Sequence, residues 1–200
     1  MALTLLEALA LATQCAGAVA PETLLSVVHV ESRFDPLAIG VNGKPRVTVF
    51  AATPQEAAAK ASALIATGRS VDLGLAQINS RNLGWLGLTV DDAFDPCRNL
   101  AAASKVLQAS YESGADAQPA LRRALSRYNT GDARRGFTNG YVAKVERAAA
   151  QVVPAIQAQP AGLVEPKPAA AEPPRPAWDV FGQTSPASFV IRATASGDGP

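Results

Sequence analysis

Glu31 has the strongest claim to acid–base chemistry, because it stands at the end of an apolar segment. It follows Val30 directly, and a helix that carries it must end before Asp35-Pro36, since proline disfavours helical backbone in the preceding residue. Apolar surroundings and the negative end of a helix dipole both disfavour a charged carboxylate. The sequence therefore predicts a raised pKa for Glu31, which suits a general acid acting near neutral pH. The alternative is a glutamate that is merely solvated or salt-bridged at a helix end.

A second polar segment, residues 72–79, carries two amide side chains, Gln77 and Asn79, shortly after Gly74. A glycine permits another backbone to approach closely, and amides suit the hydroxyl and N-acetyl groups of sugars. This combination indicates a saccharide-binding segment. The alternative is a helix start in which the apolar residues pack inward and both amides are merely exposed.

A third segment places Tyr128 and Asn129 on the last turn of a predicted helix that ends at Gly131. A phenol in this position can hydrogen-bond a carboxyl group or stack on a sugar ring. As a bare pattern, the segment also fits an ordinary helix C-terminus with a packed tyrosine.

In this order and spacing, the three segments resemble the lysozyme-like lytic transglycosylases, the SLT-domain family. The matching motifs are Glu-Ser-Arg-Phe-Asp-Pro at 31–36, Gly-Leu-Ala-Gln-Ile at 74–78 and Tyr-Asn-Thr-Gly at 128–131, and the resemblance covers about residues 14–150. The segments 38–41 and 93–100 are similar to the members associated with type IV secretion systems. Enzymes of type III secretion and conjugation share much of this pattern. Alanine at 76 and threonine at 130 depart from the methionine and alanine of many relatives, while the polar positions of the motifs remain intact.

The resemblance implies a role for each candidate residue. Glu31 corresponds to the catalytic acid, and Tyr128 to the tyrosine beside the catalytic carboxyl. Gln77, Asn79 and Asn129 correspond to substrate-binding residues of the saccharide cleft. The resemblance also implies a lysozyme-like α+β fold and a disulfide between the only two cysteines, at positions 15 and 97, for which the sequence alone leaves two buried thiols equally open.

The activity implied by the resemblance is cleavage of the β-1,4 bond between N-acetylmuramic acid and N-acetylglucosamine, with formation of a 1,6-anhydromuramoyl end. Peptidoglycan strands, envelope components of a secretion system and a periplasmic location follow from it. No cofactor or metal is implied. One alternative is a hydrolytic muramidase, which needs a second carboxylate that the sequence does not identify. Another is a non-catalytic peptidoglycan-binding module of an assembly.

Composition excludes several other classes of protein. Eighteen basic and 17 acidic residues, without long runs of either, give no sign of a nucleic-acid-binding surface. The two cysteines are far apart and the chain has one histidine, His29, so no metal-binding motif is present. No stretch approaches the roughly 18 uncharged apolar residues of a membrane span. Residues 1–20 contain Glu7 and no basic residue, so they predict a first helix over 3–16 better than a secretory signal.

The elements that must position these residues are mostly helices. Proline, capping residues and glycine mark their ends, and Asn42-Gly43 suits a tight hairpin. The fold class is therefore mainly α with a small β hairpin. Nine of the 15 prolines lie at or beyond position 154, which predicts a domain over 1–153 and a disordered Pro/Ala-rich tail over 154–200. The predicted helices span 3–16, 21–33, 53–68, 95–114, 119–129 and 140–153, and the predicted strands 39–41 and 46–50.

Overall fold

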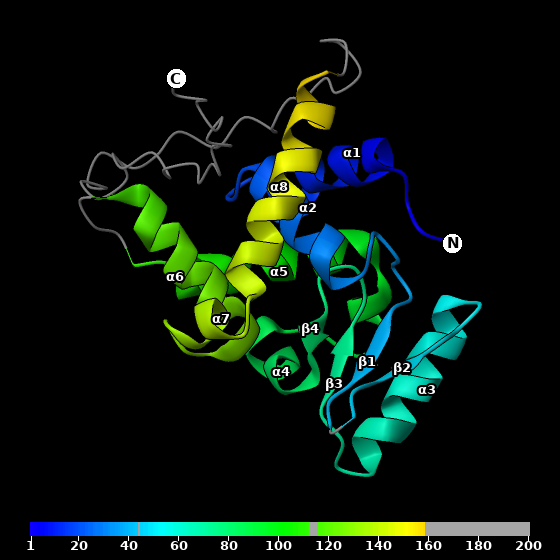
Figure 1. Ribbon diagram of the computed structural model, residues 1–200. Helices are drawn as coiled ribbons and strands as arrows, with labels where there is room; N and C mark the ends of the chain where they lie inside the picture. The colour runs from blue at the N-terminus through cyan, green and yellow to red at the C-terminus, as the bar shows by residue number, and fades with distance from the viewer. Residues whose placement is uncertain (44, 113–115, 159–200) are drawn as a thin grey trace, which may run out of the picture.

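The computed structural model describes residues 1–43, 45–112 and 116–158. In this part of the chain, helices dominate and four short strands form one antiparallel sheet, which confirms the predicted mainly α class with a small β component (Figure 1). The predicted tail lies outside the described residues from position 159 onward. In chain order the elements are α1 (Leu5–Cys15), α2 (Pro21–Glu31), β1 (Ile39–Val41), β2 (Val47–Val49), α3 (Pro54–Ala66), β3 (Val71–Leu73), β4 (Ile78–Asn79), η1 (Ser80–Asn82), α4 (Leu83–Leu86), η2 (Asp92–Phe94), α5 (Pro96–Ser110), α6 (Ala117–Thr130), α7 (Arg135–Thr138) and α8 (Tyr141–Gln157).

Two helix starts predicted from capping residues are confirmed. Asp95 Oδ1 accepts a hydrogen bond from the Arg98 amide at 2.8 Å at the start of α5, and Thr53 Oγ1 accepts one from the Glu56 amide at 3.1 Å at the start of α3. The capping box predicted at Thr53 is shifted by one residue. The Glu56 carboxylate accepts a hydrogen bond from the backbone amide of Ala52 at 2.7 Å and not from that of Thr53. Each cap satisfies backbone donors that the first helical turn leaves unpaired.

Two helix ends differ from the prediction by four residues. Helix α5 ends at Ser110, ahead of the predicted end at 114. Helix α8 continues to Gln157 and contains Pro154, although the prediction ended it at 153. A proline one turn before a helix end removes a single backbone donor, so the apolar face of α8 is enough to carry the helix past it.

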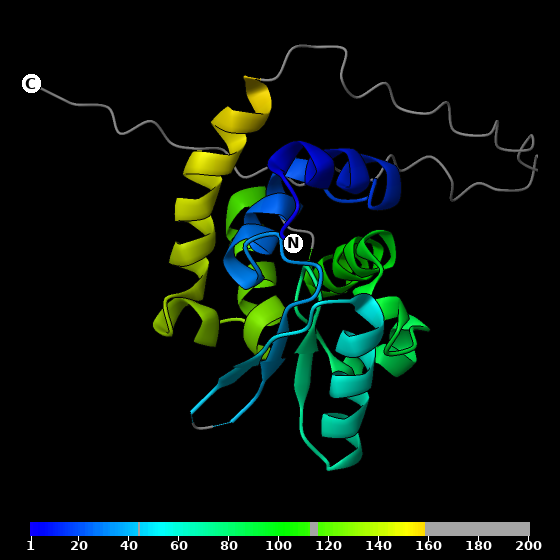
Figure 2. The same cartoon turned by 90° about the vertical axis from the view of Figure 1, so that its right-hand side faces the viewer.

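Helix α2 is the central helix of the fold. All six residues from Thr23 to Val28 are buried, and the helix packs against α8, α1 and α5 (Figure 2). A helix whose middle turns are buried on every side is stable only when other elements surround it. Its last turn leaves the core, and Glu31, its final residue, is only half-buried. The core therefore fixes the position of the last turn, which carries Glu31.

The sheet, in the order β2-β1-β3-β4, lies with α3 at the end of the molecule away from α1 (Figure 2). The predicted hairpin is confirmed, with Ile39 paired to Val49, but residues 42–46 connect its strands in place of a two-residue turn. Strands β3 and β4 were not predicted. They overlap the segment 72–79, where the helix start considered from the sequence is wrong, and they pair Asp72 with Asn79.

The N-terminal segment forms α1, as predicted. Its apolar side chains, among them the buried Ala8, Leu9 and Ala12, pack mainly against α5. Among the described residues, no helix combines the length and the apolar character that crossing a membrane requires.

A disulfide joins α1 to α5. Cys15 is the last residue of α1 and Cys97 lies in the first turn of α5, with their Cα atoms 5.4 Å apart, which confirms the pairing implied by the resemblance. The bond closes a loop that contains α2, the whole sheet and α3. It therefore fastens the first helix of the chain across the elements that carry the candidate site.

Candidate active site

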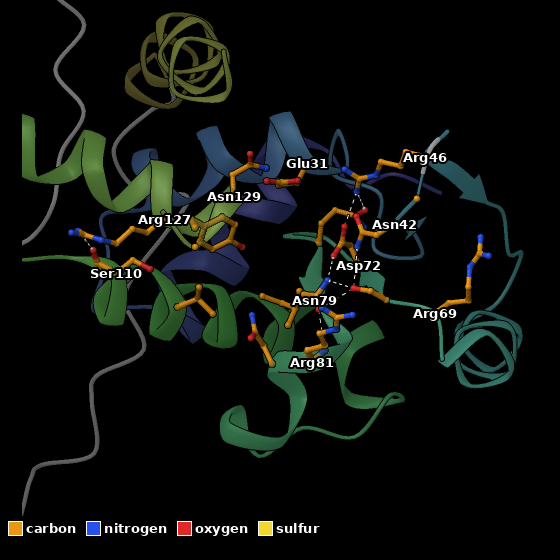
Figure 3. A pocket seen from close by; sticks show the side chains of 18 of the residues that line it. Glu31, Asn42, Arg46, Arg69, Asp72, Asn79, Arg81, Ser110, Arg127 and Asn129 are labelled. Carbon is orange, nitrogen blue, oxygen red and sulfur yellow. Dashed lines mark hydrogen bonds and ion pairs between the residues drawn. The ribbon is translucent and has the colours of Figure 1, made fainter. Parts of the chain in front are cut away.

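Two hollows meet at Glu31 and form one groove between the helices and the sheet (Figure 3). Their volumes are about 1160 and 490 Å³, and both are lined by Glu31, Arg46, Gln77 and Asn129. The groove thus extends to both sides of the candidate acid. Trp85 of α4, 57% exposed, lines the larger hollow and offers an apolar face on which a sugar ring can stack.

The carboxyl group of Glu31 lies against protein on one side and faces the groove on the other. Tyr141, the first residue of α8, donates its hydroxyl to Oε1 of Glu31 at 2.6 Å. In the described part of the chain, Oε2 has no protein hydrogen-bond partner. The tyrosine therefore fixes the orientation of the carboxyl group and leaves one oxygen for a ligand.

Burial raises the pKa of Glu31 to about 7, in the direction expected from the sequence. The hydrogen bond from Tyr141 and the positive charges of Arg46 and Lys144 act in the opposite direction, while the negative charge of Asp72 adds to the increase. Desolvation is the largest of these effects, because it removes the water that stabilises a carboxylate. Glu31 therefore keeps its proton closer to neutral pH than an ordinary glutamate does.

Two tyrosines stand near Glu31, and they play different parts. The hydroxyl of Tyr128 donates to the backbone carbonyl of Ala76 at 2.7 Å, so it does not donate to the carboxyl group. Burial raises the pKa of Tyr128 well above its ordinary value, and the charge of Glu31 raises it further. Tyr128 is thus close to the acid and fastens α6 to the sheet turn, whereas the direct partner of Glu31 is Tyr141.

Gln77 lies in the groove, but its amide is engaged in internal hydrogen bonds. Nε2 donates to the carbonyls of Ala38 at 3.1 Å and Gly74 at 3.0 Å, and Oε1 accepts from Arg46 at 3.2 Å. Its backbone has a φ of 50°, a left-handed conformation that is strained for a residue with a side chain. The three hydrogen bonds hold this conformation and connect β1 to the turn before β4. Gln77 therefore shapes the floor of the groove.

Asn79 and Asp72 continue this polar floor across β3 and β4 (Figure 3). Asn79 Nδ2 donates to Asp72 Oδ1 at 2.6 Å and to Ser70 Oγ at 2.9 Å. The other oxygen of Asp72 pairs with the Arg46 guanidinium at 3.0 Å. Asp72 is thus the second carboxylate of the larger hollow, but Arg46 and Asn79 occupy both of its oxygens.

Asn129 reaches the groove from the last turn of α6 and lines both hollows. Its Oδ1 accepts a hydrogen bond from Nδ2 of Asn139 at 3.0 Å. Nδ2 of Asn129 makes no hydrogen bond with any described residue. All five residues predicted for the site, Glu31, Gln77, Asn79, Tyr128 and Asn129, therefore line the same groove.

The turn between β3 and β4 depends on Gly74 and Asn99. Asn99 is buried on α5; its Oδ1 accepts from the Ala76 amide at 2.8 Å, and its Nδ2 donates to the carbonyls of Leu73 at 2.9 Å and Ala93 at 2.7 Å. Gly74 has a φ of +71°, and an added Cβ would overlap the Ala93 carbonyl and lie 2.5 Å from Asn99 Nδ2. The close approach expected at this glycine is confirmed.

Replacing Gly74 by alanine is expected to lower the free energy of unfolding by about 2 to 5 kcal/mol, because left-handed strain and steric overlap coincide there. Urea unfolding of the variant would measure the change. The matched control is Gly84→Ala in α4, where nothing lies within 4 Å of the added Cβ and φ is negative. Its stability should stay level or rise. Equal stability of the Gly74→Ala and Gly84→Ala proteins would contradict this account of the turn.

Sequence reasoning missed three residues of the site. Tyr141 lies 110 residues from Glu31, and no local pattern connects the two. Arg46 and Asp72 lie in segments whose pairing through β1 and β3 was not predicted, so their ion pair was not visible either. The one available signal was the Asn42-Gly43 hairpin, which turns β2 back toward the site and brings Arg46 with it.

Comparison with known proteins agrees with the geometry of the site. The family model of the transglycosylase SLT domain matches residues 8–151. The chain is 45% identical over 174 residues to the protein virB1 of Agrobacterium fabrum, which covers 86% of this chain and 69% of the relative. It is 37% identical over an aligned stretch of 209 residues to the type IV secretion system protein virB1 of Brucella suis biovar 1, covering 96% and 87% of the two chains. No solved structure matches the chain.

The matched region begins within α1 and ends within α8, so it contains every residue of the groove that the structure describes. It also contains both cysteines of the disulfide. The chain therefore belongs to the transglycosylase SLT-domain family, among its VirB1-like members.

Proposed function

We propose that this protein is a peptidoglycan lytic transglycosylase that cleaves the β-1,4 bond between N-acetylmuramic acid and N-acetylglucosamine and forms a 1,6-anhydromuramoyl end. The observation that carries the proposal is the setting of Glu31: a carboxyl group with a pKa of about 7, at the junction of two hollows, with one oxygen available to a ligand. A general acid needs this combination of proton and access.

The reaction uses one carboxyl group twice. Protonated Glu31 gives its proton to the glycosidic oxygen while the bond from that oxygen to the anomeric carbon breaks, which releases the 4-hydroxyl of N-acetylglucosamine. The 6-hydroxyl of the muramoyl residue then forms a bond to the anomeric carbon and passes its proton to the Glu31 carboxylate. The acid is regenerated and no water is consumed. Attack from within the same sugar gains its rate from proximity.

Tyr141 is a positioning residue in this scheme. Its hydroxyl donates to Oε1, so the proton to be transferred resides on Oε2, which faces the groove. The same hydrogen bond stabilises the carboxylate that forms after the first step. Gln77, Asn79, Tyr128 and Asn129 are proposed to form the walls that hold the sugars on either side of this oxygen.

A hydrolytic muramidase is the second candidate, since Asp72 lines the larger hollow together with Glu31. A base that activates water needs a carboxylate oxygen with an open lone pair directed at the water. The hydrogen bonds from Arg46 and Asn79 to Asp72 oppose this role. A purely binding module is disfavoured by the desolvated Glu31, because burying an ionisable group is costly unless it serves a purpose.

The product distinguishes these candidates. Purified sacculi are digested with the protein, and the released muropeptides are analysed by mass spectrometry. A lytic transglycosylase gives anhydromuramoyl ends, whose mass is lower by one water than that of reducing ends. Reducing ends would identify a hydrolase and direct attention to Asp72. A complete lack of released products would favour the binding module.

The biological setting is proposed from the relatives. One of them carries the name type IV secretion system protein, and the wall of peptidoglycan lies in the path of any machine that spans the envelope. We therefore place this protein in the periplasm, where it opens the wall locally for a type IV secretion or conjugation machine. Its partners would be glycan strands and envelope components of that machine.

The pH dependence of turnover tests the role of the raised pKa. Because the protonated form is the active acid, kcat/KM is expected to fall about tenfold per pH unit above pH 7. Tyr141→Phe removes a hydrogen bond that favours the carboxylate, so the falling limb should move to higher pH. His29→Gln is the control, since His29 is the only histidine and packs against Phe34. If the falling limb moved in the His29→Gln protein and stayed in place in the Tyr141→Phe protein, it would not report the protonation of Glu31, and the prediction would be wrong.

A further inference from the structure

The larger hollow of the groove has an excess of positive charge. Four arginines line it, Arg46, Arg69, Arg81 and Arg127, against the two carboxyl groups of Glu31 and Asp72. The whole chain, by contrast, has a formal charge of only +1. Because the pKa of Glu31 is raised, one of these two carboxyl groups is only partly charged at neutral pH. The excess is therefore a local property of this hollow.

Two of the four guanidinium groups already have carboxylate partners. Arg46 pairs with Asp72 at 3.0 Å, and Arg127 pairs with Glu112 at 2.8 Å and donates to the carbonyl of Ser110 at 3.1 Å. The side chains of Arg69 and Arg81 are exposed and have neither an ion pair nor a hydrogen bond with any described residue. The uncompensated charge of the hollow thus resides on these two arginines.

The fold brings Arg69 and Arg81 to the same end of the sheet. Strands β3 and β4 pair Asp72 with Asn79, and beyond this pair the amide of Val71 donates to Ser80 Oγ at 3.1 Å. Arg69 precedes β3 and Arg81 follows β4, so the two flank one end of this ladder. Figure 3 shows Arg81 next to Asn79 of the polar floor, Arg69 farther along the groove at the right of the view, and Glu31 across the hollow from Arg81. Two separate chain segments thus present guanidinium groups along the sheet side of the same hollow.

We infer that Arg69 and Arg81 form a subsite for the carboxylates of the peptide stems that peptidoglycan strands carry. The identity of this anion rests on the proposed function. In a glycan strand with stems, the lactyl carboxyl of the muramoyl residue is consumed in an amide bond, so the sugars are neutral and the carboxylates belong to the peptides. A guanidinium group presents paired N–H donors that match a carboxylate, and sugars alone have no group that needs them.

This subsite gives the groove two kinds of recognition. The amides and the indole near the floor suit uncharged sugars, while the arginines at the sheet end select strands whose stems carry free carboxylates. The arginines act on binding, because they lie across the hollow from Glu31 and do not contact its carboxyl group. Their loss should raise KM and leave kcat nearly unchanged.

The test compares two substrates. One is soluble glycan strands bearing uncrosslinked peptide stems with free carboxylates, and the other is the same strands after the stem carboxyl groups have been converted to primary amides, which keeps the lactyl amide intact. For the wild-type protein, kcat/KM is expected to be at least about tenfold higher on the strands with free stem carboxylates. In the Arg69→Ala/Arg81→Ala protein, this preference should vanish, with kcat/KM lowered on the strands with free stem carboxylates and unchanged on the amidated ones. Arg69→Lys/Arg81→Lys should retain part of the preference, since it keeps the charge and loses the paired donors.

The matched control is Lys105→Ala/Arg147→Ala, which removes two exposed positive charges from residues that line neither hollow. It should preserve the preference. Equal losses on both substrates, no loss on either, or the same result from the control pair would overturn the subsite. Calorimetric titration of Glu31→Gln protein with both kinds of strand supplies a readout that needs no turnover. A binding preference for free stem carboxylates, in the absence of anhydromuramoyl products, would support the subsite and refute the proposed reaction.

Discussion

Glu31→Gln is expected to reduce turnover of peptidoglycan by at least about 100-fold, because it removes the proton that the leaving oxygen requires and keeps the shape of the side chain. The amide can still accept the hydrogen bond from Tyr141 at Oε1. Initial rates of anhydromuropeptide release from sacculi, followed by mass spectrometry, measure the loss. Turnover within a few-fold of wild type would show that another residue supplies the proton.

The same substitution is expected to stabilise the fold above pH 7. Glu31 has a pKa of about 7 in the folded protein against a reference of 4.5, so the folded state binds its proton more tightly than the unfolded chain does. Below about pH 4.5 Glu31 is protonated in both states and does not affect the free energy of unfolding. Between pH 4.5 and 7 its ionisation in the unfolded chain lowers the free energy of unfolding progressively, and above pH 7 the loss is constant. The difference corresponds to roughly 3 kcal/mol that glutamine avoids.

Urea unfolding of both proteins at pH 4 and pH 8 tests this linkage. The difference in unfolding free energy between Glu31→Gln and wild type should be larger at pH 8. A catalytic loss accompanied by a gain in stability would separate chemistry from folding. A variant that is less stable at pH 8 would mean that the carboxylate contributes to the fold, and the loss of turnover would then need another explanation.

Removing the disulfide is expected to lower the free energy of unfolding by about 4 to 5 kcal/mol. The bond between Cys15 and Cys97 spans 82 residues of sequence, and in the chain-entropy model its loss frees the unfolded chain by this amount. The variant is Cys15→Ser/Cys97→Ser, measured by urea unfolding against the oxidised wild type.

The reduced wild type is the matched control, since it lacks the bond but keeps both cysteines. It should lose nearly the same stability as the double serine variant, and adding reductant to the variant should change nothing. A double variant as stable as the oxidised protein would show that the packing between α1 and α5 suffices to hold the first helix in place.

The sequence was most informative where local rules decide the structure. The helix that carries Glu31 could be predicted because Pro21 opens it, Asp35-Pro36 requires its end, and apolar residues fill the interval. The caps at Thr53 and Asp95 were visible for the same reason, since a capping side chain bonds a backbone amide three residues away. The sequence predicted a close approach at Gly74, but it did not predict its partners, the Ala93 carbonyl and the Asn99 side chain.

The parts that escaped prediction depend on contacts between distant segments. Strands β3 and β4 contain three and two residues, too few for an alternating pattern to be recognised. Strand β3 depends on pairing with β1, strand β4 depends on pairing with β3, and the buried amide of Asn99 holds the turn between them. Tyr141 was invisible for the same reason, because only the packing of α8 on α2 brings its hydroxyl to Glu31.

The burial of α2 has a consequence for how such a protein can change over evolutionary time. The acid projects from a helix enclosed by the core, whereas Arg69, Arg81 and Trp85 belong to loops and short helices at the rim. Substitutions at the rim alter which strands are held without moving the carboxyl group, and substitutions in α2 disturb the whole core. Specificity is thus free to diversify while the chemistry stays constant, and a designer who exchanges rim segments between relatives should obtain new preferences on an unchanged catalytic scaffold.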